Sequence, residues 1–207
     1  MKHKLKGVYL VTNTSIQHQY NHAQLAEMAL RGGANIVQFR DNQSGARESL
    51  KYAKSVVNVC RSYNAMSIIN DRTDIAIAAE ATGVHLGQDD LPLQTAREIL
   101  NDGQIIGGTS STLKEARQVE AEGADYVALG HIFDTTTKQK DYAPRGLDIL
   151  QKVSKSLSIP VVAIGGITLE NASDVIAAGA DMIAVSSAIC CAPNPVKATE
   201  KLMNLFD

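Results

Sequence analysis

Cysteine is scarce in this sequence, and long apolar runs are missing. The 207 residues contain only three cysteines, an odd number that does not fit a framework of disulfide bonds, so we expect a reducing compartment. No apolar stretch approaches the roughly 20 residues that a membrane-spanning helix needs. The apolar run at 8–11 is too short for the core of a signal peptide. We therefore expect a cytoplasmic protein with no membrane partner.

An excess of positive charge and several cofactor motifs are also missing. The net charge of −2 does not indicate the strongly basic surface typical of nucleic-acid binding, so we expect no nucleic-acid partner. The first apolar run is followed by TNTSIQ and not by GxGxxG, which argues against a dinucleotide-binding loop. HxH, CxxC and HExxH patterns do not occur, so zinc is not expected, and no Ser/His/Asp signature indicates nucleophilic catalysis.

Eight short apolar runs alternate with longer amphipathic segments. Several of the apolar runs are hydrophobic at successive residues, which is typical of strands buried on both faces of a parallel sheet. The expected strands are 7–12, 35–40, 66–71, 83–88, 105–110, 125–133, 160–166 and 182–189. Helical periodicity is clearest at 22–33, 49–64, 112–123 and 170–179. We also expect Arg72 or Asp74 to open the third helix and Pro92 to lie in the first turn of the fourth.

Strict alternation of strands and helices leaves two architectures, an open doubly wound sheet or a closed barrel. Eight units within 207 residues, without a dinucleotide loop, favour closure. We therefore predict an α/β protein with one domain over 1–207, a single (β/α)8 TIM barrel around a closed sheet of eight parallel strands. In such barrels functional residues lie at the carboxyl ends of the strands, and phosphate commonly binds after the seventh and eighth.

Small residues end the last two expected strands. Gly165 and Gly166 end the seventh, and Ser186 and Ser187 come late in the eighth. Glycines let the backbone approach an anion closely, and N–H groups of a following helical turn point at it. The pattern favours a phosphate cup made largely of backbone N–H groups over a tight turn followed by two small residues.

Acidic residues end or follow the third and fourth expected strands. Asn70 and Asp71 end one of them, and Asp90 lies in the loop after the other. Neighbouring loops of this kind place two carboxylates within reach of one hard cation, and Mg²⁺ prefers oxygen ligands. The alternative is that Asp71 and Asp90 cap the helices that follow. The pair favours a Mg²⁺ site.

Cationic side chains lie at two other strand ends. Gln38 and Arg40 alternate at the end of the second strand and should point to the same side; Arg40 suits phosphate, although a salt bridge to Asp41 or Asp71 is the alternative. The polar loop 134–141 carries hydroxyls and two lysines, which fits a lid over a polyanion better than a merely solvated loop. Two anion sites and a metal together indicate substitution with loss of pyrophosphate.

Two histidines are candidates for proton transfer, or else hydrogen-bonded core residues. His85 lies inside the fourth strand, and His131 lies nearer the site end of the sixth. Cys190 and Cys191 follow the eighth strand with no base placed for either, so we interpret both as buried packing residues.

These motifs resemble those of the thiamine phosphate synthases, also called thiamine-phosphate pyrophosphorylases, which join a pyrimidine methyl diphosphate to a thiazole phosphate and release pyrophosphate. The matching segments, over essentially the whole chain, are VQFRD at 37–41, IIND at 68–71, GVHLGQDD at 83–90, DYVALGHIFDTTTK at 125–138, AIGGIT at 163–168 and AVSSAI at 184–189. Their order and spacing make the superfamily assignment specific.

The resemblance implies a role for each matching residue. The pyrimidine diphosphate would be held by Gln38, Arg40, Asn70 and Lys138, with Arg40 and Lys138 as the catalytic cations and His85 lining the pyrimidine side. Mg²⁺ would be bound by Asp71 and Asp90. The thiazole phosphate would be held by Thr135, Thr137, Gly166, Ser186 and Ser187.

Two positions depart from the family pattern. The strand-two motif usually reads Gln-x-Arg-x-Lys, but its last position here is Asn42, so one cation that contacts the diphosphate is missing. Thr109 stands where the family usually has Ser, and it keeps a substrate-binding hydroxyl. Lys138, Lys140 or a reshaped lid would have to compensate for Asn42, or activity would be lower.

Two other functions stay open. The related thiazole tautomerases share the barrel and the cup, and their Gly-His-x-Phe-x-Thr stretch matches 130–135, with His131 as the proton-transfer residue. They tend to lack the metal-binding aspartates, so Asp71 and Asp90 favour the synthase. A non-catalytic thiazole phosphate-binding protein, with Asn42 as the mark of lost turnover, is less favoured. Oligomeric state is not predicted beyond a possible homo-oligomer.

Overall fold

A computed structural model describes residues 5–135 and 142–206. Its eight strands are β1 Gly7–Val11, β2 Ile36–Phe39, β3 Met66–Asn70, β4 Gly83–Leu86, β5 Ile105–Ser110, β6 Tyr126–Gly130, β7 Val161–Ile164 and β8 Met182–Val185. The α-helices are α1 His22–Arg31, α2 Ala46–Ser62, α3 Thr73–Ala78, α4 Leu93–Ile99, α5 Leu113–Ala121, α6 Gly146–Ser154, α7 Ala172–Ala177, α8 Ser187–Cys190 and α9 Pro195–Met203; the 3-10 helix η1 spans Asn204–Phe206.

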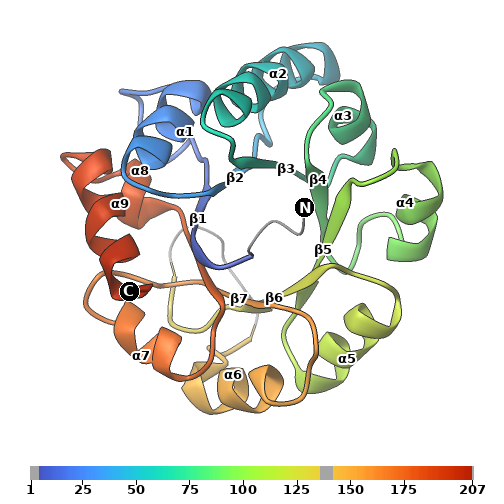
Figure 1. The fold of residues 1–207 in the computed structure, drawn as a ribbon, viewed down its shortest axis with the longest axis vertical. Coiled ribbons are helices and arrows are strands. Elements are labelled where there is room, and N and C mark those ends of the chain that lie inside the picture. The colour runs from blue at the N-terminus through green and yellow to red at the C-terminus, as the bar shows by residue number, and fades with distance from the viewer. Residues whose placement is uncertain (1–4, 136–141, 207) are drawn as a thin grey trace.

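The strands close into a barrel in the order of the chain. Each strand pairs in parallel with the next, and β8 returns to β1 with Gly7 opposite Met182. The helices form an outer ring around the strands (Figure 1). The predicted (β/α)8 barrel with a closed parallel sheet of eight strands is therefore confirmed.

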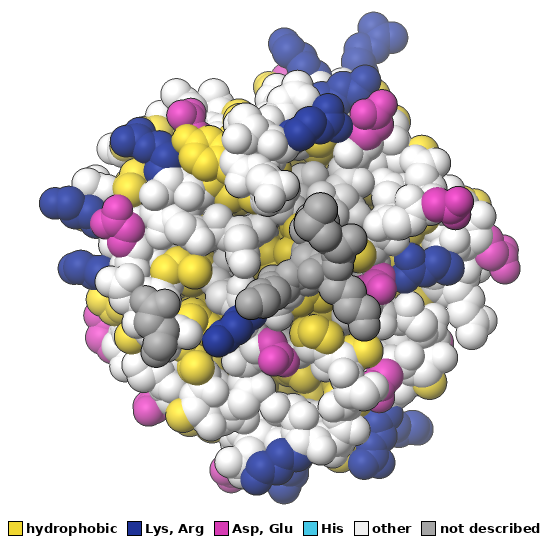
Figure 2. Space-filling view, in the orientation of Figure 1, with side chains coloured by type: hydrophobic (Ala, Val, Ile, Leu, Met, Phe, Trp, Pro, Cys, Tyr) yellow, Lys and Arg dark blue, Asp and Glu magenta, His cyan; other side chains and the backbone are white. Residues whose placement is uncertain are grey.

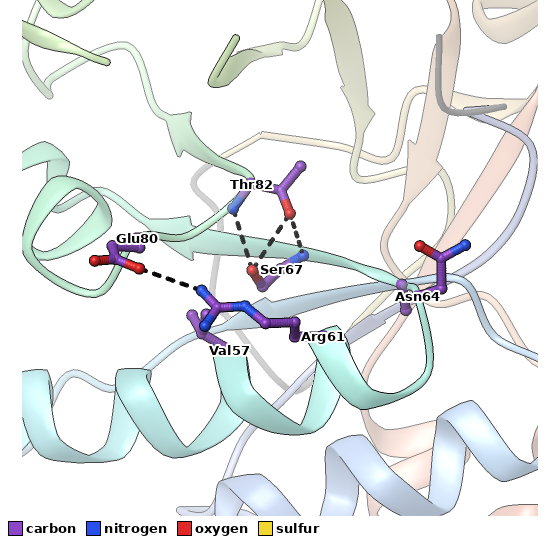
Figure 3. Close-up of a pocket in the computed structure, with 7 residues that line it drawn as sticks. Val57, Arg61, Asn64, Ser67, Glu80 and Thr82 are labelled. Atoms are coloured by element: carbon purple, nitrogen blue, oxygen red, sulfur yellow. Dashed lines mark hydrogen bonds and ion pairs between the residues drawn. The ribbon is translucent and has the colours of Figure 1, made fainter. Parts of the chain in front are cut away.

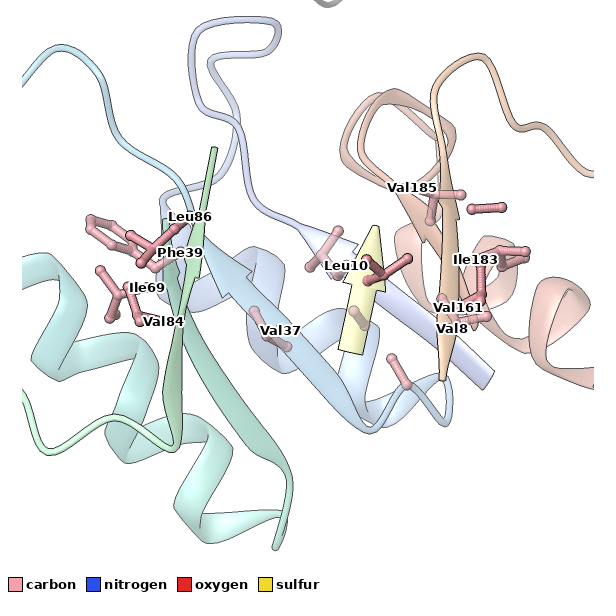
Figure 4. Packing of buried hydrophobic residues seen from close by; sticks show 14 of the residues in the cluster. Val8, Leu10, Val37, Phe39, Ile69, Val84, Leu86, Val161, Ile183 and Val185 are labelled. Carbon is pink, nitrogen blue, oxygen red and sulfur yellow. The ribbon is translucent and has the colours of Figure 1, made fainter. Parts of the chain in front are cut away.

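Two apolar layers account for this architecture. The outer layer lies between the sheet and the helices and includes Val8, Leu10 and Val37 (Figure 4). The alternate residues of the same strands, such as Tyr9 and Ile36, form a second buried cluster. Successive side chains of a strand point to opposite faces of the sheet, and both faces are buried against an apolar layer. This explains why the strands are hydrophobic at successive residues. Burying one large aliphatic side chain contributes about 1.5–3 kcal/mol.

The expected element boundaries hold to within a few residues, with two exceptions. The sixth strand was expected over 125–133, but β6 ends at Gly130, so His131 lies just beyond the strand. The eighth strand was expected over 182–189, but β8 ends at Val185 and the short helix α8 begins at Ser187. The apolar pattern misled because Ala188 and Ile189 continue it, although they belong to helical backbone. The correction places both serines at the start of a helix and not at the end of a strand.

Side-chain hydrogen bonds cap the start of some helices but not of others. At the start of α1 the Asn21 side chain accepts from the Gln24 N–H while the Gln24 side chain accepts from the Asn21 N–H. Arg72 holds the N-cap position of α3, as expected, but its side chain makes no capping hydrogen bond. Pro92 is the N-cap of α4, one residue before the first turn in which it was expected.

Charged side chains are distributed over the face seen in Figure 2. Dark blue and magenta groups stand near one another around the rim, and neither sign gathers into a single large patch on this face. Within the described ranges, no helix is long and apolar enough to cross a bilayer.

Candidate functional site

The carboxyl ends of the strands carry most of the predicted site residues, as expected for a barrel. Asn70 is the last residue of β3, and Arg40 follows β2 directly. Neighbouring strands are hydrogen-bonded, so the loops after β2, β3, β4 and β5 open side by side. The loops after β7 and β8 meet in the same way, since Ile164 pairs with Ala184.

Asp71 occupies a strained position beyond β3. Its φ of 63° lies in the left-handed region, which few residues other than glycine adopt. The backbone is held there because the Asp71 N–H donates to the His85 carbonyl at 2.8 Å and the Arg72 N–H donates to the Asn70 carbonyl at 2.7 Å. Such strain gathers at functional sites when the surroundings over-determine it. Asp71 is exposed and is not the N-cap of α3, so the capping alternative is wrong for this residue.

Asp90 lies on the neighbouring loop and shapes it. One carboxylate oxygen accepts from the Gly87 N–H at 2.6 Å. The N-cap of α4 is Pro92, so Asp90 does not cap that helix either. Gln88 donates its side-chain N–H to the Thr109 carbonyl at 2.5 Å, which ties this loop to the end of β5.

Asp71 and Asp90 are the two predicted Mg²⁺ ligands, and they lie on loops that follow neighbouring strands. Among the described residues, no group of three or more His, Cys, Asp or Glu side chains could hold a metal ion. Mg²⁺ needs fewer protein ligands than that, because it is usually bound through one or two carboxylates plus water and substrate phosphates. Exposed Asp71 and half-buried Asp90 on adjacent loops fit that donor set, while the role itself stays a prediction.

Arg40 extends from a loop that Asp41 organises. Asp41 accepts from the Gln43 N–H at 2.9 Å and the Ser44 N–H at 3.3 Å. Burial acts to raise the pKa of Asp41, but these hydrogen bonds outweigh it and hold the pKa below its usual value. No ion pair in the described part of the chain includes Arg40, so the salt-bridge alternative finds no support there. The cation stays available for an anion.

The glycine turn after β7 has a backbone that only glycine adopts readily. Gly165 and Gly166 have φ values of 101° and 66°. A Cβ on Gly166 would stand 2.4 Å from the Asp134 carbonyl oxygen. Asn171 braces the turn, since its side-chain amide donates to the Gly166 carbonyl at 3.0 Å and accepts from the Thr168 N–H at 2.9 Å. The turn is therefore rigid and packed against the stretch after β6.

Ser186 and Ser187 follow β8, the strand that pairs with β7. Ser187 is exposed and is the first residue of α8, so its backbone N–H faces away from the helix. The Ser186 hydroxyl oxygen is buried without an oxygen or nitrogen partner in the described structure. It lies beside the Cys190 thiol, a weak hydrogen-bonding group, and burial raises the pKa of that thiol to about 11. An unsatisfied hydroxyl at this place fits a site that a polar ligand completes.

A polar network crosses the interior of the barrel below these loops. Gln38 donates its Nε2–H to the Tyr9 hydroxyl at 2.8 Å, and the hydroxyls of Tyr9 and Tyr126 are 2.9 Å apart. The Tyr126 hydroxyl is 3.1 Å from His85 Nδ1, and His85 Nε2 is 2.9 Å from the Thr109 hydroxyl. We call these five residues, Gln38, Tyr9, Tyr126, His85 and Thr109, the central network. It links three predicted substrate-binding residues from three different strands.

Tyr9 and Tyr126 were not predicted as site residues, because each lies within an apolar strand run. The signal in the sequence is the tyrosine itself, since a hydroxyl buried on a strand needs a hydrogen-bond partner. Gly107 pairs with both His85 and Tyr126, and a Cβ on it would stand 2.0 Å from the Tyr126 ring. The glycine at this place leaves the space that the phenol ring occupies.

His131 and Cys191 differ in their surroundings. His131 is buried, packs 5.2 Å from the Tyr142 ring, and its Nδ1 is buried without a partner in the described structure. Cys190 is buried as expected, but Cys191 is exposed, so its interpretation as a packing residue is wrong. It lies at the end of the four-residue α8, where the chain returns to the surface.

Residues 136–141 of the predicted lid, Thr137, Lys138 and Lys140 among them, lie outside the described residues. Thr135 is described and is half-buried after β6. The predicted lid therefore stays a prediction.

A pocket of about 140 Å³ lies at the other end of the barrel, between α2 and the amino ends of β3 and β4 (Figure 3). Four of its polar side chains are paired with one another. Ser67 accepts from the Thr82 N–H at 3.1 Å, and Arg61 is 3.4 Å from Glu80. We interpret it as part of the stable end of the barrel.

Fold and site together define a (β/α)8 barrel with polar groups at the strand ends, a glycine turn after β7, and one carboxylate on each of the loops after β3 and β4. The chain matches the family described as thiamine monophosphate synthase over residues 8–189. It belongs to that family.

Individual relatives agree with this assignment. A thiamine-phosphate synthase from Chlorobium luteolum is 47% identical over 86% of this chain and 84% of its own length. One from Methanospirillum hungatei is 42% identical over 97% of both chains. The solved thiamine phosphate pyrophosphorylase from Pyrococcus furiosus superposes with a TM-score of 0.90 at 37% identity and covers 98% of this chain and 96% of its own.

Proposed function

We propose that this protein is a thiamine phosphate synthase, a transferase that condenses 4-amino-2-methyl-5-pyrimidinylmethyl diphosphate with thiazole phosphate to give thiamine phosphate and pyrophosphate. The observation that carries the proposal is the likeness to thiamine-phosphate synthases at 42–47% identity over most of the chain. The retained carboxylates and the glycine turn agree with it.

Arg40, Asn70, Asp71 and Asp90 would act on the diphosphate. When Mg²⁺ is bound it neutralises charge on the leaving group, and Asp71 and Asp90 are the residues that would hold it. Arg40 suits two diphosphate oxygens because its guanidinium is planar and permanently charged. Asn70, half-buried at the end of β3, would donate to the same group. Lys138 would add a second cation.

The chemistry is a dissociative substitution. The bond between the pyrimidine methyl carbon and the diphosphate oxygen breaks, its electron pair leaves with pyrophosphate, and the thiazole ring nitrogen forms the new bond to that carbon. Arg40 and Lys138 stabilise the charge that develops on the leaving group, which is usually the largest contribution to catalysis of this kind. Gln38, His85 and Thr109 would hold the pyrimidine.

The turn after β7 and the start of α8 would hold the thiazole phosphate. Gly166 lets the backbone approach the anion, and Ser186 and Ser187 offer hydroxyls and N–H groups. Thr135 and Thr137 would contact the same substrate from the loop after β6. The cup fixes the acceptor so that its ring nitrogen faces the pyrimidine methyl carbon.

One experiment separates the synthase from the thiazole tautomerase that would use His131. Purified protein receives the unrearranged thiazole carboxylate phosphate alone, and the products are followed by mass and absorbance. We expect no aromatic isomer above the buffer rate without the pyrimidine diphosphate. Isomerisation by the wild type that is lost in His131→Asn would contradict the synthase proposal and favour the tautomerase. The relatives named above favour the synthase.

Asn42→Lys should lower the KM for the pyrimidine diphosphate. Asn42 is exposed in the loop after β2, two residues beyond Arg40, so a lysine there adds a charge beside the leaving group. One charge-assisted contact at an exposed site is worth roughly a three- to tenfold change in KM. Initial rates at varied diphosphate measure it, and Asn42→Gln is the matched neutral control. A KM that stays or rises means that other cations already serve this role.

Other properties follow from the same proposal. Mg²⁺ is the cofactor, and the partners are the two small-molecule substrates, with no nucleic acid and no membrane. The protein acts in the cytoplasm, where a homo-oligomer is possible. The non-catalytic alternative is disfavoured by the retained Asp71 and Asp90.

A further inference from the structure

The central network has a direction, because each hydroxyl has one proton to donate. Gln38 donates its Nε2–H to Tyr9, so Tyr9 can pass its own proton to Tyr126. Tyr126 then donates to His85 Nδ1, which must be the unprotonated ring nitrogen. His85 in turn donates from Nε2 to the Thr109 hydroxyl. Turning the Gln38 amide over would exchange donor and acceptor in every hydrogen bond of the central network.

Burial keeps this arrangement intact. Tyr9, Tyr126, Gln38 and His85 are 2%, 1%, 5% and 8% exposed, so a lost partner cannot be replaced easily by bulk water. Burial raises the pKa of both tyrosines above its usual value, so each keeps its hydroxyl proton. The Tyr126 ring also stacks on His85, with 5.6 Å between centroids and 17° between planes. The stacking therefore holds the orientation of the His85 ring, in addition to the two hydrogen bonds of its nitrogens.

We propose that Tyr9 and Tyr126 are positioning residues that fix the His85 tautomer and the turn of the Gln38 amide, and thereby select an aminopyrimidine as the ligand at this place. The inference rests on the proposed function for the identity of that ligand. Neither tyrosine needs to touch the reacting atoms.

The selected pattern has one acceptor and one donor. One of the two Nε2–H groups of Gln38 donates to Tyr9, which fixes the turn of the amide and leaves the Gln38 Oε1 as an acceptor. Thr109, which accepts from His85, keeps its hydroxyl proton to donate. An aminopyrimidine offers the complement, an amino donor beside a ring-nitrogen acceptor. A hydroxypyrimidine in its keto form offers the opposite pattern and should be rejected.

The test uses Tyr126→Phe, which removes one hydroxyl and keeps the ring. Nitrogen-15 NMR of the folded wild-type protein should show His85 neutral with its proton on Nε2. In Tyr126→Phe, the form protonated on Nδ1 should appear. The KM for the pyrimidine diphosphate should rise by about tenfold, as expected for one lost buried hydrogen bond, while the KM for thiazole phosphate changes by less than about twofold.

Two further variants keep the test sharp. Tyr9→Phe separates Gln38 from Tyr126 but leaves the Tyr126–His85 pair, so the diphosphate KM should rise while His85 keeps its proton on Nε2. Tyr63→Phe removes the hydroxyl of a residue that is 42% exposed just after α2, and it should change neither quantity. If Tyr126→Phe does not fold, the inference is tested by two other results: the His85 spectrum of the wild-type protein and the diphosphate KM of Tyr9→Phe.

The outcomes separate this inference from the proposed function. A wild-type His85 with its proton on Nδ1, or a Tyr126→Phe protein with an unchanged His85 spectrum and unchanged KM, overturns the inference even if thiamine phosphate is made. Conversely, the predicted spectra in a protein that makes no thiamine phosphate support the network and overturn the proposed function. The NMR measurement needs no substrate, so the two results are independent.

Discussion

Asp71→Asn should abolish most Mg²⁺-supported turnover while leaving the thiazole phosphate site nearly unchanged. The variant keeps the shape of the side chain and removes the negative charge, so a hard cation loses one of two carboxylate ligands. We expect the apparent Mg²⁺ affinity to fall by about 100-fold, and kcat/KM to fall with it by a similar factor at fixed Mg²⁺. Rates measured across a Mg²⁺ series give the apparent Mg²⁺ affinity. Calorimetry with thiazole phosphate measures whether the affinity of the other site is unchanged.

Asp89→Asn is the matched control for this prediction. Asp89 is an exposed carboxylate in the same acidic loop as Asp90, so its loss changes the net charge near the site equally. It should leave the Mg²⁺ response within about twofold, since exposed charges interact weakly through water. Equal effects from Asp71→Asn and Asp89→Asn would mean that general negative charge, and not a defined ligand, attracts the cation.

Gly166→Ala should destroy thiazole phosphate binding. The residue has a φ of 66°, and the added Cβ would stand 2.4 Å from the Asp134 carbonyl oxygen, which belongs to the backbone and cannot swing away. The turn must therefore move. A displacement of about 1 Å at a binding site costs on the order of 100-fold, and we expect a loss of that size in thiazole phosphate affinity by calorimetry.

Gly123→Ala is the control that distinguishes the effect of backbone strain from the loss of thiazole phosphate binding. Gly123 also has a positive φ, 87°, but nothing lies within 4 Å of an added Cβ. Its alanine variant should lose about 1–2 kcal/mol of unfolding free energy and keep full thiazole phosphate affinity. If Gly166→Ala binds as well as Gly123→Ala, the turn after β7 does not hold the phosphate.

The sequence predicted the barrel because its evidence is periodic and repeated. Each strand is apolar on both faces, and residues such as Val8 and Tyr9 both proved buried, one in each layer. The site could also be located, since barrel topology brings strand ends together whatever their side chains. Asp71 and Gly166 were singled out on that basis, and both have backbone angles that few residues adopt.

Other features depend on contacts that no local pattern encodes. The bond between Tyr9 and Tyr126 joins residues 117 positions apart, and it forms only because β1 and β6 face each other across the closed sheet. The end of β8 was misplaced because Ala188 and Ile189 suit either backbone. Cys191 turned out exposed because α8 is so short. Burial and partners at these places come from the closed fold.

The most direct test of the account is the condensation itself. Purified protein is mixed with the pyrimidine diphosphate, thiazole phosphate and Mg²⁺, and thiamine phosphate is followed by mass together with released pyrophosphate. We expect both products in equal amounts, with turnover that stops when the Mg²⁺ is chelated and resumes when it is restored. Folded protein that binds thiazole phosphate but forms neither product would contradict the proposed function.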